Sequence, residues 1–239
     1  MVDPRIVAGS DYRASDREWT RIDWRAHRRR VGLPGASVNY VEIGEGEPLV
    51  FVHGVSGCWQ NWLGGLVAVE LAVAAPEAFE RLVLVSAAGI INTWRPEERA
   101  VVTAWAWRHF SPLFADRGRQ IVTRPRLRRA VFGPFVRFPN RLADDVLVEQ
   151  IVNGLRQAEG FEPALADLIR TDFRDGLATI EIPTLIVWGL SDRVVPVAAA
   201  ASYHRRIPHS RLEIFERTGH VHQLERPLRF NALLDEFLE

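Results

Sequence analysis

The chain has 239 residues, 47% of them hydrophobic and 25% charged, which is typical of one globular domain with a sizeable apolar core. Its 30 basic and 30 acidic residues cancel, so net charge favours neither nucleic acid nor an anionic membrane as a partner. The single cysteine, Cys58, excludes an internal disulfide, and residues 1–30 contain no apolar run long enough for a signal peptide or a membrane span. We therefore expect a cytoplasmic protein.

The N-terminal region predicts a loose arm followed by a hairpin. Residues 1–20 are polar and weakly patterned, as in an arm that joins no core. Residues 21–31 and 37–43 alternate polar and apolar side chains, and the turn signal Leu33-Pro34-Gly35 lies between them. This pattern indicates two antiparallel strands.

A strand, a helix and a second strand are expected next. The continuous apolar run 48–52, which ends in His53-Gly54, predicts a strand buried on both faces at the centre of a sheet. Apolar residues at helical spacing over 64–79 predict a helix, and the apolar run 82–85 predicts the second strand. Such a unit is parallel and right-handed.

Residues 91–174 differ in composition from the rest of the chain. Arg-rich stretches with helical periodicity are interspersed with aromatic side chains, which predicts a helical insertion with an aromatic lining. The aromatic residues are Trp94, Trp105, Trp107, Phe110, Phe114, Phe132, Phe135, Phe138 and Phe161. The arginines of the cluster over 124–129 are expected to face solvent.

The α/β pattern resumes after this insertion. The predicted elements are a strand over 184–188, a helix over 197–206, a strand over 211–215 and a helix over 227–238. Residues 21–90 and 175–239 are therefore expected to form one core, and residues 91–174 a helical cap.

Three motifs stand at the ends of predicted strands: His53-Gly54, Asp192 and Gly219-His220. In this order, with the hairpin before them and the insertion between them, they resemble the α/β-hydrolase superfamily in its capped form, from about residue 21 to the C-terminus. The resemblance implies an α/β fold with a mostly parallel sheet flanked by helices and a helical cap insertion. It also places ligands at the carboxyl ends of the strands.

The resemblance implies a role for each motif. Asp192 would orient and polarise His220, which would act as general base and then general acid in acyl transfer. His53-Gly54 would turn the backbone so that the Val55 amide points into an oxyanion hole. The implied activity is hydrolysis of ester or related acyl compounds by a Ser-His-Asp mechanism, with a small apolar ligand and neither cofactor nor metal.

The nucleophile of that mechanism is missing, because the chain contains no Gly-x-Ser-x-Gly. Gly64-Gly65, at the start of the predicted helix, looks like the second half of the family's nucleophile elbow, and Trp62 stands where its serine would be. An indole N–H only donates a hydrogen bond. We therefore expect an internal deletion of central strands, on the order of 50 residues, and an inactive protein.

Substitute nucleophiles are weak. Ser56 fails the elbow pattern because Cys58 stands where the second glycine belongs, so an ordinary loop serine is the simpler interpretation. A lone cysteine such as Cys58 is more often a small buried hydrophobe. His222 follows His220 closely, but no cluster of Cys or carboxylates nearby favours a metal site.

Two other interpretations stay open: a catalytically dead protein that binds an apolar small molecule, and an unstable deletion product. The oligomeric state is open as well. If the fold holds, Asp192 and His220 should lie within about 2.6–3.2 Å of each other. The strand 48–52 should then pair directly with the strand 82–85, since an open slot would leave buried backbone groups unsatisfied.

Overall fold

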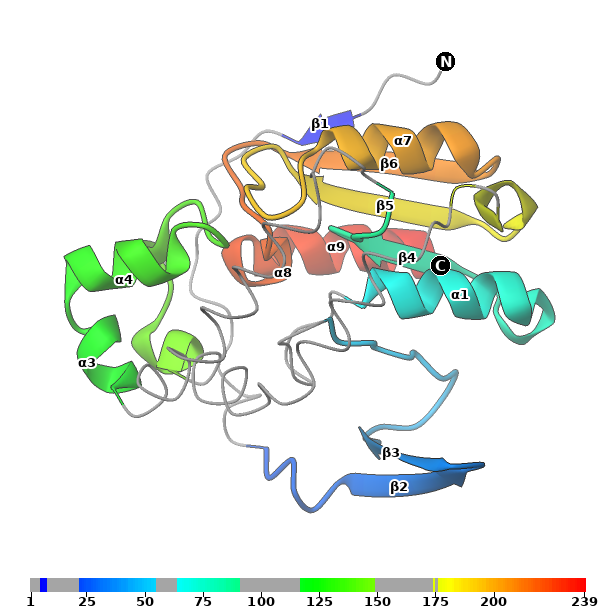
Figure 1. The fold of residues 1–239 in the computed structure, drawn as a ribbon, viewed down its shortest axis with the longest axis horizontal. Helices are drawn as coiled ribbons and strands as arrows, with labels where there is room; N and C mark the ends of the chain where they lie inside the picture. Colours follow the sequence, from blue (N-terminus) through cyan, green and yellow to red (C-terminus); the bar gives the residue numbers. More distant parts are fainter. Residues whose placement is uncertain (1–4, 8–21, 55–63, 91–116, 149–173, 175) are drawn as a thin grey trace.

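The computed structural model describes residues 5–7, 22–54, 64–90, 117–148, 174 and 176–239 (Figure 1). Its centre is a four-stranded parallel sheet with the order β1-β6-β5-β4. The strands are β1 (Arg5–Val7), β6 (Ser210–Phe215), β5 (Thr184–Gly189) and β4 (Leu82–Val85). The predicted strands 82–85, 184–188 and 211–215 are thus confirmed within one residue.

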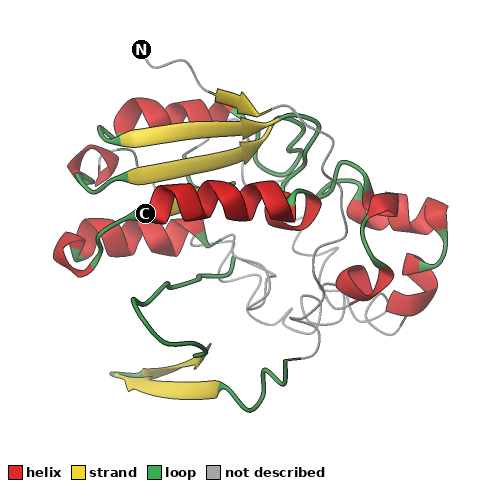
Figure 2. Cartoon of the chain, turned by 180° about the vertical axis from the view of Figure 1, so that it is seen from behind, coloured by secondary structure: helices red, strands yellow, loops and turns green. Residues whose placement is uncertain are grey.

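Helices cover both faces of the sheet (Figures 1 and 2). One face carries α1 (Gly65–Ala74), α7 (Ala198–Arg206) and the short η5 (Gly176–Thr179), while α9 (Pro227–Leu238) covers the other. A 3-10 turn, η2 (Pro76–Ala78), follows α1, and α8 (His222–Glu225) precedes α9. The helices predicted over 64–79, 197–206 and 227–238 are confirmed, except that the first breaks at Ala75 before Pro76, which has no N–H to continue the ladder.

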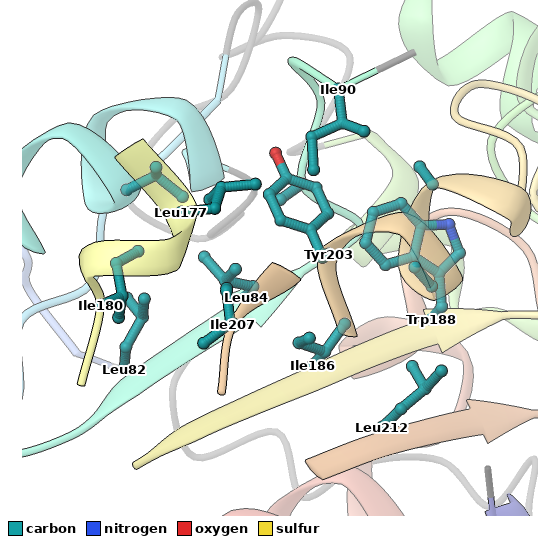
Figure 3. Packing of buried hydrophobic residues seen from close by; sticks show 14 of the residues in the cluster. Leu82, Leu84, Ile90, Leu177, Ile180, Ile186, Trp188, Tyr203, Ile207 and Leu212 are labelled. Carbon is teal, nitrogen blue, oxygen red and sulfur yellow. The ribbon is translucent and has the colours of Figure 1, made fainter. Parts of the chain in front are cut away.

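Strand β5 shows why this arrangement is stable. Ile186 and Trp188 point into the cluster of α1 and α7, whereas Leu185 and Val187 pack against α9. All four side chains are fully buried, as alternation on a two-faced strand requires. Figure 3 shows the first cluster, in which the rings of Trp188 and Tyr203 lie 6.2 Å apart.

The predicted hairpin is present as β2 (Arg28–Leu33) and β3 (Ala36–Val41), which pair antiparallel around a turn with Gly35 at φ 77°. Its first strand begins at Arg28 and not at residue 21, and it includes Leu33, which was predicted to lie in the turn. The hairpin lies away from the four-stranded sheet in both views (Figures 1 and 2). Its apolar side chains are therefore exposed: Val31, Leu33, Val38 and Tyr40 all retain more than 40% of their accessible surface.

The prediction of a buried central strand over 48–52 is wrong. This segment has no strand pairing, and Leu49, Val50 and Phe51 are 47%, 68% and 47% exposed. Among the described strands β4 pairs with β5 alone, so the predicted pairing of 48–52 with 82–85 is also wrong. A continuous apolar run shows that a segment favours burial, but it does not say which strand will cover it.

The structure also differs from the sequence analysis near the N-terminus. Arg5–Val7, assigned above to a loose arm, adds an edge strand to the sheet, with Ile6 opposite Ile214 of β6. The rest of the predicted arm lies outside the described residues. Three residues are too few for their alternation to predict a strand, and only the neighbouring edge of β6 supplies the hydrogen bonds.

Part of the predicted insertion is described, over residues 117–148. It forms α3 (Gly118–Val122), α4 (Pro125–Phe132) and η3 (Pro139–Arg141), with a small core of Ile121, Val122, Phe132 and Leu147. Trp94, Trp105, Trp107, Phe110, Phe114 and Phe161 lie outside the described residues. No helix in the described part of the chain is both long and apolar enough to cross a bilayer.

The prediction that the arginines over 124–129 face solvent is wrong for Arg128. Arg128 is only 7% exposed. Its guanidinium donates to the carboxylate of Asp144 and to the carbonyl oxygens of Leu142 and Pro139. A buried guanidinium requires such partners. Arg128 thereby connects α4 to η3 and to the residues that follow η3.

Candidate active site

Asp192 and His220 follow the adjacent parallel strands β5 and β6, whose carboxyl ends meet at one edge of the sheet. The Nδ1–H of His220 donates to Oδ2 of Asp192 at 2.8 Å, within the predicted distance. Only 10% of the His220 side chain and 0% of the Asp192 side chain are exposed. Because Nδ1 donates to the carboxylate, Nε2 of a neutral His220 is left as a proton acceptor.

The carboxylate of Asp192 is held by four donors. Its Oδ1 accepts the backbone N–H groups of Val194 and Val195 at 2.8 and 2.9 Å, and its Oδ2 accepts the Ser86 hydroxyl at 2.8 Å as well as His220. Burial by itself raises the pKa of Asp192, but the hydrogen bond and charge of His220, with the Val195 and Ser86 bonds, bring that pKa below its ordinary value. The site therefore keeps an ionised acid next to its base.

The loops that carry Asp192 and His220 are joined by backbone hydrogen bonds. The N–H of Leu190 donates to the carbonyl of Phe215, and the N–H of Ser191 donates to that of Thr218, both at 2.9 Å. The indole N–H of Trp188 donates to the carbonyl of Val195 at 3.0 Å and closes the Asp192 loop on itself. The acid and base are thus positioned by main chain rather than by the two side chains alone.

The His220 loop is also tied to the insertion through Glu225, which is 1% exposed. One carboxylate oxygen of Glu225 accepts the N–H of Gly219 at 2.6 Å, and the other accepts the N–H of Arg137 at 2.9 Å. A Cβ on Gly219 would lie 2.6 Å from the carbonyl oxygen of Phe135, so only glycine permits this approach. No motif or periodicity in the sequence marks Glu225 for this role.

His222 is structural in this fold. It is completely buried between the rings of Phe215 and Phe230, and its Nε2–H donates to the carbonyl of Val187 at 3.1 Å. Burial, reinforced by the charge of nearby His220, lowers the pKa of His222 to about 3, so the ring is neutral. In the part of the chain that the structure describes, no group of His, Cys, Asp and Glu side chains is placed to hold a metal ion.

The predicted oxyanion-hole residues are described only in part. His53 is exposed, its ring contacts the Gly54 carbonyl at 3.1 Å, and within the described ranges no hydrogen bond links either residue to Asp192 or His220. Val55 lies outside the described residues, as do Ser56, Cys58 and Trp62. The residues just before His53 contact the start of α1, because the N–H of Gly64 donates to the carbonyl of Val52 at 2.9 Å.

Comparisons with known proteins agree with this geometry. The family model described as alpha/beta hydrolase fold matches residues 63–227, which is more than half of the chain. A 2-hydroxy-6-oxononadienedioate/2-hydroxy-6-oxononatrienedioate hydrolase of Cupriavidus pinatubonensis is 28% identical over 183 residues, covering 74% of this chain and 60% of the relative. A putative carbamate hydrolase of Cronobacter sakazakii is 30% identical over 192 residues, covering 77% and 66%.

Among solved structures, the enol-lactonase from Burkholderia xenovorans superposes with a TM-score of 0.59 at 23% identity, covering 73% of this chain and 62% of that one. At this identity the likeness shows the fold alone. The chain spans about three fifths to two thirds of the length of the curated relatives named here. The parallel sheet with helices on both faces and the match of the family model together establish that the chain belongs to the α/β-hydrolase fold family.

Proposed function

We propose that this chain is related to α/β-hydrolases of small apolar ester or related acyl compounds, that it retains the acid and base of a Ser-His-Asp site, and that it is inactive because it lacks the serine. The buried hydrogen bond between Asp192 and His220 carries this proposal. A carboxylate that fixes the tautomer of an imidazole on the neighbouring strand is the arrangement required for general-base catalysis of acyl transfer.

The chemistry follows from the tautomer. With Nδ1–H committed to Asp192, Nε2 of His220 takes the proton of an attacking hydroxyl, and the carboxylate stabilises the imidazolium that forms. The same nitrogen then returns the proton to the leaving group. His220 and Asp192 thus supply proton transfer, but the covalent step needs a nucleophile that reaches Nε2.

Four observations support loss of that nucleophile together with the central strands. The chain has no Gly-x-Ser-x-Gly, and its α1 helix begins directly at Gly65. Leu49, Val50 and Phe51 remain exposed, and β4 pairs with β5 alone among the described strands. A strand between them would cover both, and it would lead into the missing serine.

The named relatives guide the substrate class only coarsely. They are called hydrolases of a dienedioate and of a carbamate, and the structural neighbour is called an enol-lactonase. We carry over to this chain the feature that these names share, hydrolysis, and assign it to ester or related acyl bonds because an Asp-His pair serves acyl transfer.

A fluorophosphonate probe and an activated short-chain ester test the proposal on the full chain. We expect neither stoichiometric labelling nor alcohol release above that of the His220→Ala variant, since loss of the nucleophile removes most of the rate enhancement. Stoichiometric labelling that is lost in His220→Ala would show that the chain does have a nucleophile, and Ser56 would then be the candidate. A cooperative melting transition is expected of a stable protein, and its absence would identify a deletion product without a fold.

A further inference from the structure

Ser86 contacts the candidate site from a strand that carries neither the acid nor the base. It is the first residue after β4, and its backbone N–H donates to the carbonyl of Val187 at 3.1 Å, which continues the ladder with β5. Its hydroxyl donates to Oδ2 of Asp192 at 2.8 Å, and the residue is only 1% exposed. Ser86 and Asp192 are 106 residues apart in the chain.

The backbone of Ser86 is strained. Its φ is 45°, in the left-handed region that costs conformational energy for every residue except glycine. Within the described ranges one other non-glycine residue has a positive φ, Arg217 at 52°, and it stands just before the His220 loop. Such outliers persist where the surroundings fix them, and they concentrate at functional sites.

The surroundings of Ser86 do fix this turn. A Cβ on Gly65 would lie 2.2 Å from the Cβ of Ala87, so the first turn of α1 packs directly against the residue that follows Ser86. On the other side, the Tyr203 hydroxyl donates to the carbonyl of Ala88 at 2.8 Å, and Figure 3 shows the Tyr203 ring inside the buried cluster. The turn is therefore held by α1 and α7 together.

We propose that Ser86 is a positioning residue for the acid of the site, which holds the carboxylate of Asp192 in the plane that presents Oδ2 to His220. The inference rests on the proposed function in one respect, that Asp192 and His220 are the acid and base. Two backbone N–H groups hold Oδ1, but Oδ2 would otherwise have His220 as its one described donor. Because the Asp192 side chain is fully buried, no solvent replaces the missing donor.

Three substitutions at Ser86 separate the effect of the hydroxyl from that of the strained backbone, and a fourth substitution, at His220, assigns the signal. Ser86→Ala removes the donor and keeps the strain, whereas Ser86→Gly removes both the donor and the strain. Ser86→Asn tolerates the left-handed conformation and brings an amide N–H that donates in place of the hydroxyl. His220→Gln removes the imidazole and assigns its signal.

The readout is the downfield proton resonance of the imidazole Nδ1–H in the full chain, which needs no turnover. We expect a resonance that is absent in His220→Gln, exchanges about tenfold faster with solvent in Ser86→Ala and Ser86→Gly, and returns to slow exchange in Ser86→Asn. If Ser86→Ala does not fold, Ser86→Gly carries the same test, because glycine adopts the observed φ freely.

The outcomes distinguish this inference from the proposed function. An unchanged resonance in folded Ser86→Ala or Ser86→Gly would overturn the role of Ser86 and leave the pair intact. Exchange in Ser86→Asn as fast as in Ser86→Gly would also overturn it, since a restored donor would then have no effect. A wild-type protein without this resonance would overturn the acid–base pair itself, and the inference with it.

Discussion

The backbone N–H of His220 donates to the carbonyl oxygen of Phe135 at 2.7 Å, which joins the base of the site directly to the insertion. Glu225 adds a second connection, because its carboxylate accepts the N–H of Gly219 next to His220 and the N–H of Arg137 near Phe135. The arrows of β5 and β6 point toward the side where α3 and α4 lie (Figures 1 and 2). Residues 117–148 are therefore part of what holds His220 in place.

The first prediction concerns Glu225. Replacing it by alanine leaves the N–H groups of Gly219 and Arg137 without this acceptor, at about 1–3 kcal/mol for the buried Gly219 N–H and less for the partly exposed one of Arg137. We expect Glu225→Ala to lower the free energy of unfolding by several times the effect of Glu181→Ala, a control at an exposed glutamate. Denaturant titration measures both. Equal effects would show that the bridge contributes nothing.

The second prediction concerns the close approach at Gly219. In Gly219→Ala the new Cβ meets the Phe135 carbonyl at 2.6 Å and a Glu225 carboxylate oxygen at 2.9 Å, so the loop must move away. We expect lower thermal stability and loss of the His220 Nδ1–H resonance. Gly32→Ala is the matched control, since nothing lies within 4 Å of its Cβ. A Gly219→Ala variant that kept both properties would contradict this packing.

The third prediction is a pH dependence caused by His222. The unfolded chain protonates this histidine near its ordinary pKa of 6.5, whereas burial lowers its pKa in the folded protein to about 3. Between these values the unfolded state binds the extra proton, so the free energy of unfolding falls as pH falls from about 6.5, by at most about 1.4 kcal/mol per pH unit. Above pH 6.5 the group contributes no slope.

The variant His222→Gln should reduce that slope between pH 6.5 and 4.5, a window above the range in which Asp192 takes up its proton. His209→Gln, at an exposed histidine, is the control and should keep the slope. Unfolding curves at several pH values measure it. An unchanged slope in His222→Gln would mean that His222 is protonated in the folded state.

The parts of this fold that follow from the sequence are those encoded by local patterns. The run 184–188 is apolar enough to demand burial on both faces, residues 211–215 alternate charged and apolar side chains up to Ile214, and the helix over 227–238 has one apolar side. Because carboxyl ends of neighbouring parallel strands share one edge, placing Asp192 and His220 after these strands was enough to predict their contact.

The parts that did not follow depend on distant partners. Segment 48–52 has the pattern of a buried strand, but no described strand stands beside it. The hydroxyl of Ser86 and the carboxylate of Glu225 act across 106 and 88 residues of chain. A single serine after a strand, or a single glutamate in a four-residue helix, carries no periodicity, so only the folded chain reveals what it contacts.

The last prediction concerns Trp62, which occupies the position of the elbow serine by its spacing to Gly64. We expect that Trp62→Ser will not create ester turnover. An elbow serine needs a sheet strand that leads into the strained turn and exposes the hydroxyl. The last described residues before Trp62, 48–54, belong to no strand of the sheet.

The measurement compares Trp62→Ser with the double variant Trp62→Ser/His220→Ala in release of alcohol from an activated short-chain ester. Equal and background rates in the two proteins are expected, since a serine that does not reach His220 Nε2 gains nothing from the base. Turnover in the single variant that disappears in the double variant would show that a working elbow survives next to α1. The loss of central strands would then be the wrong account of this chain.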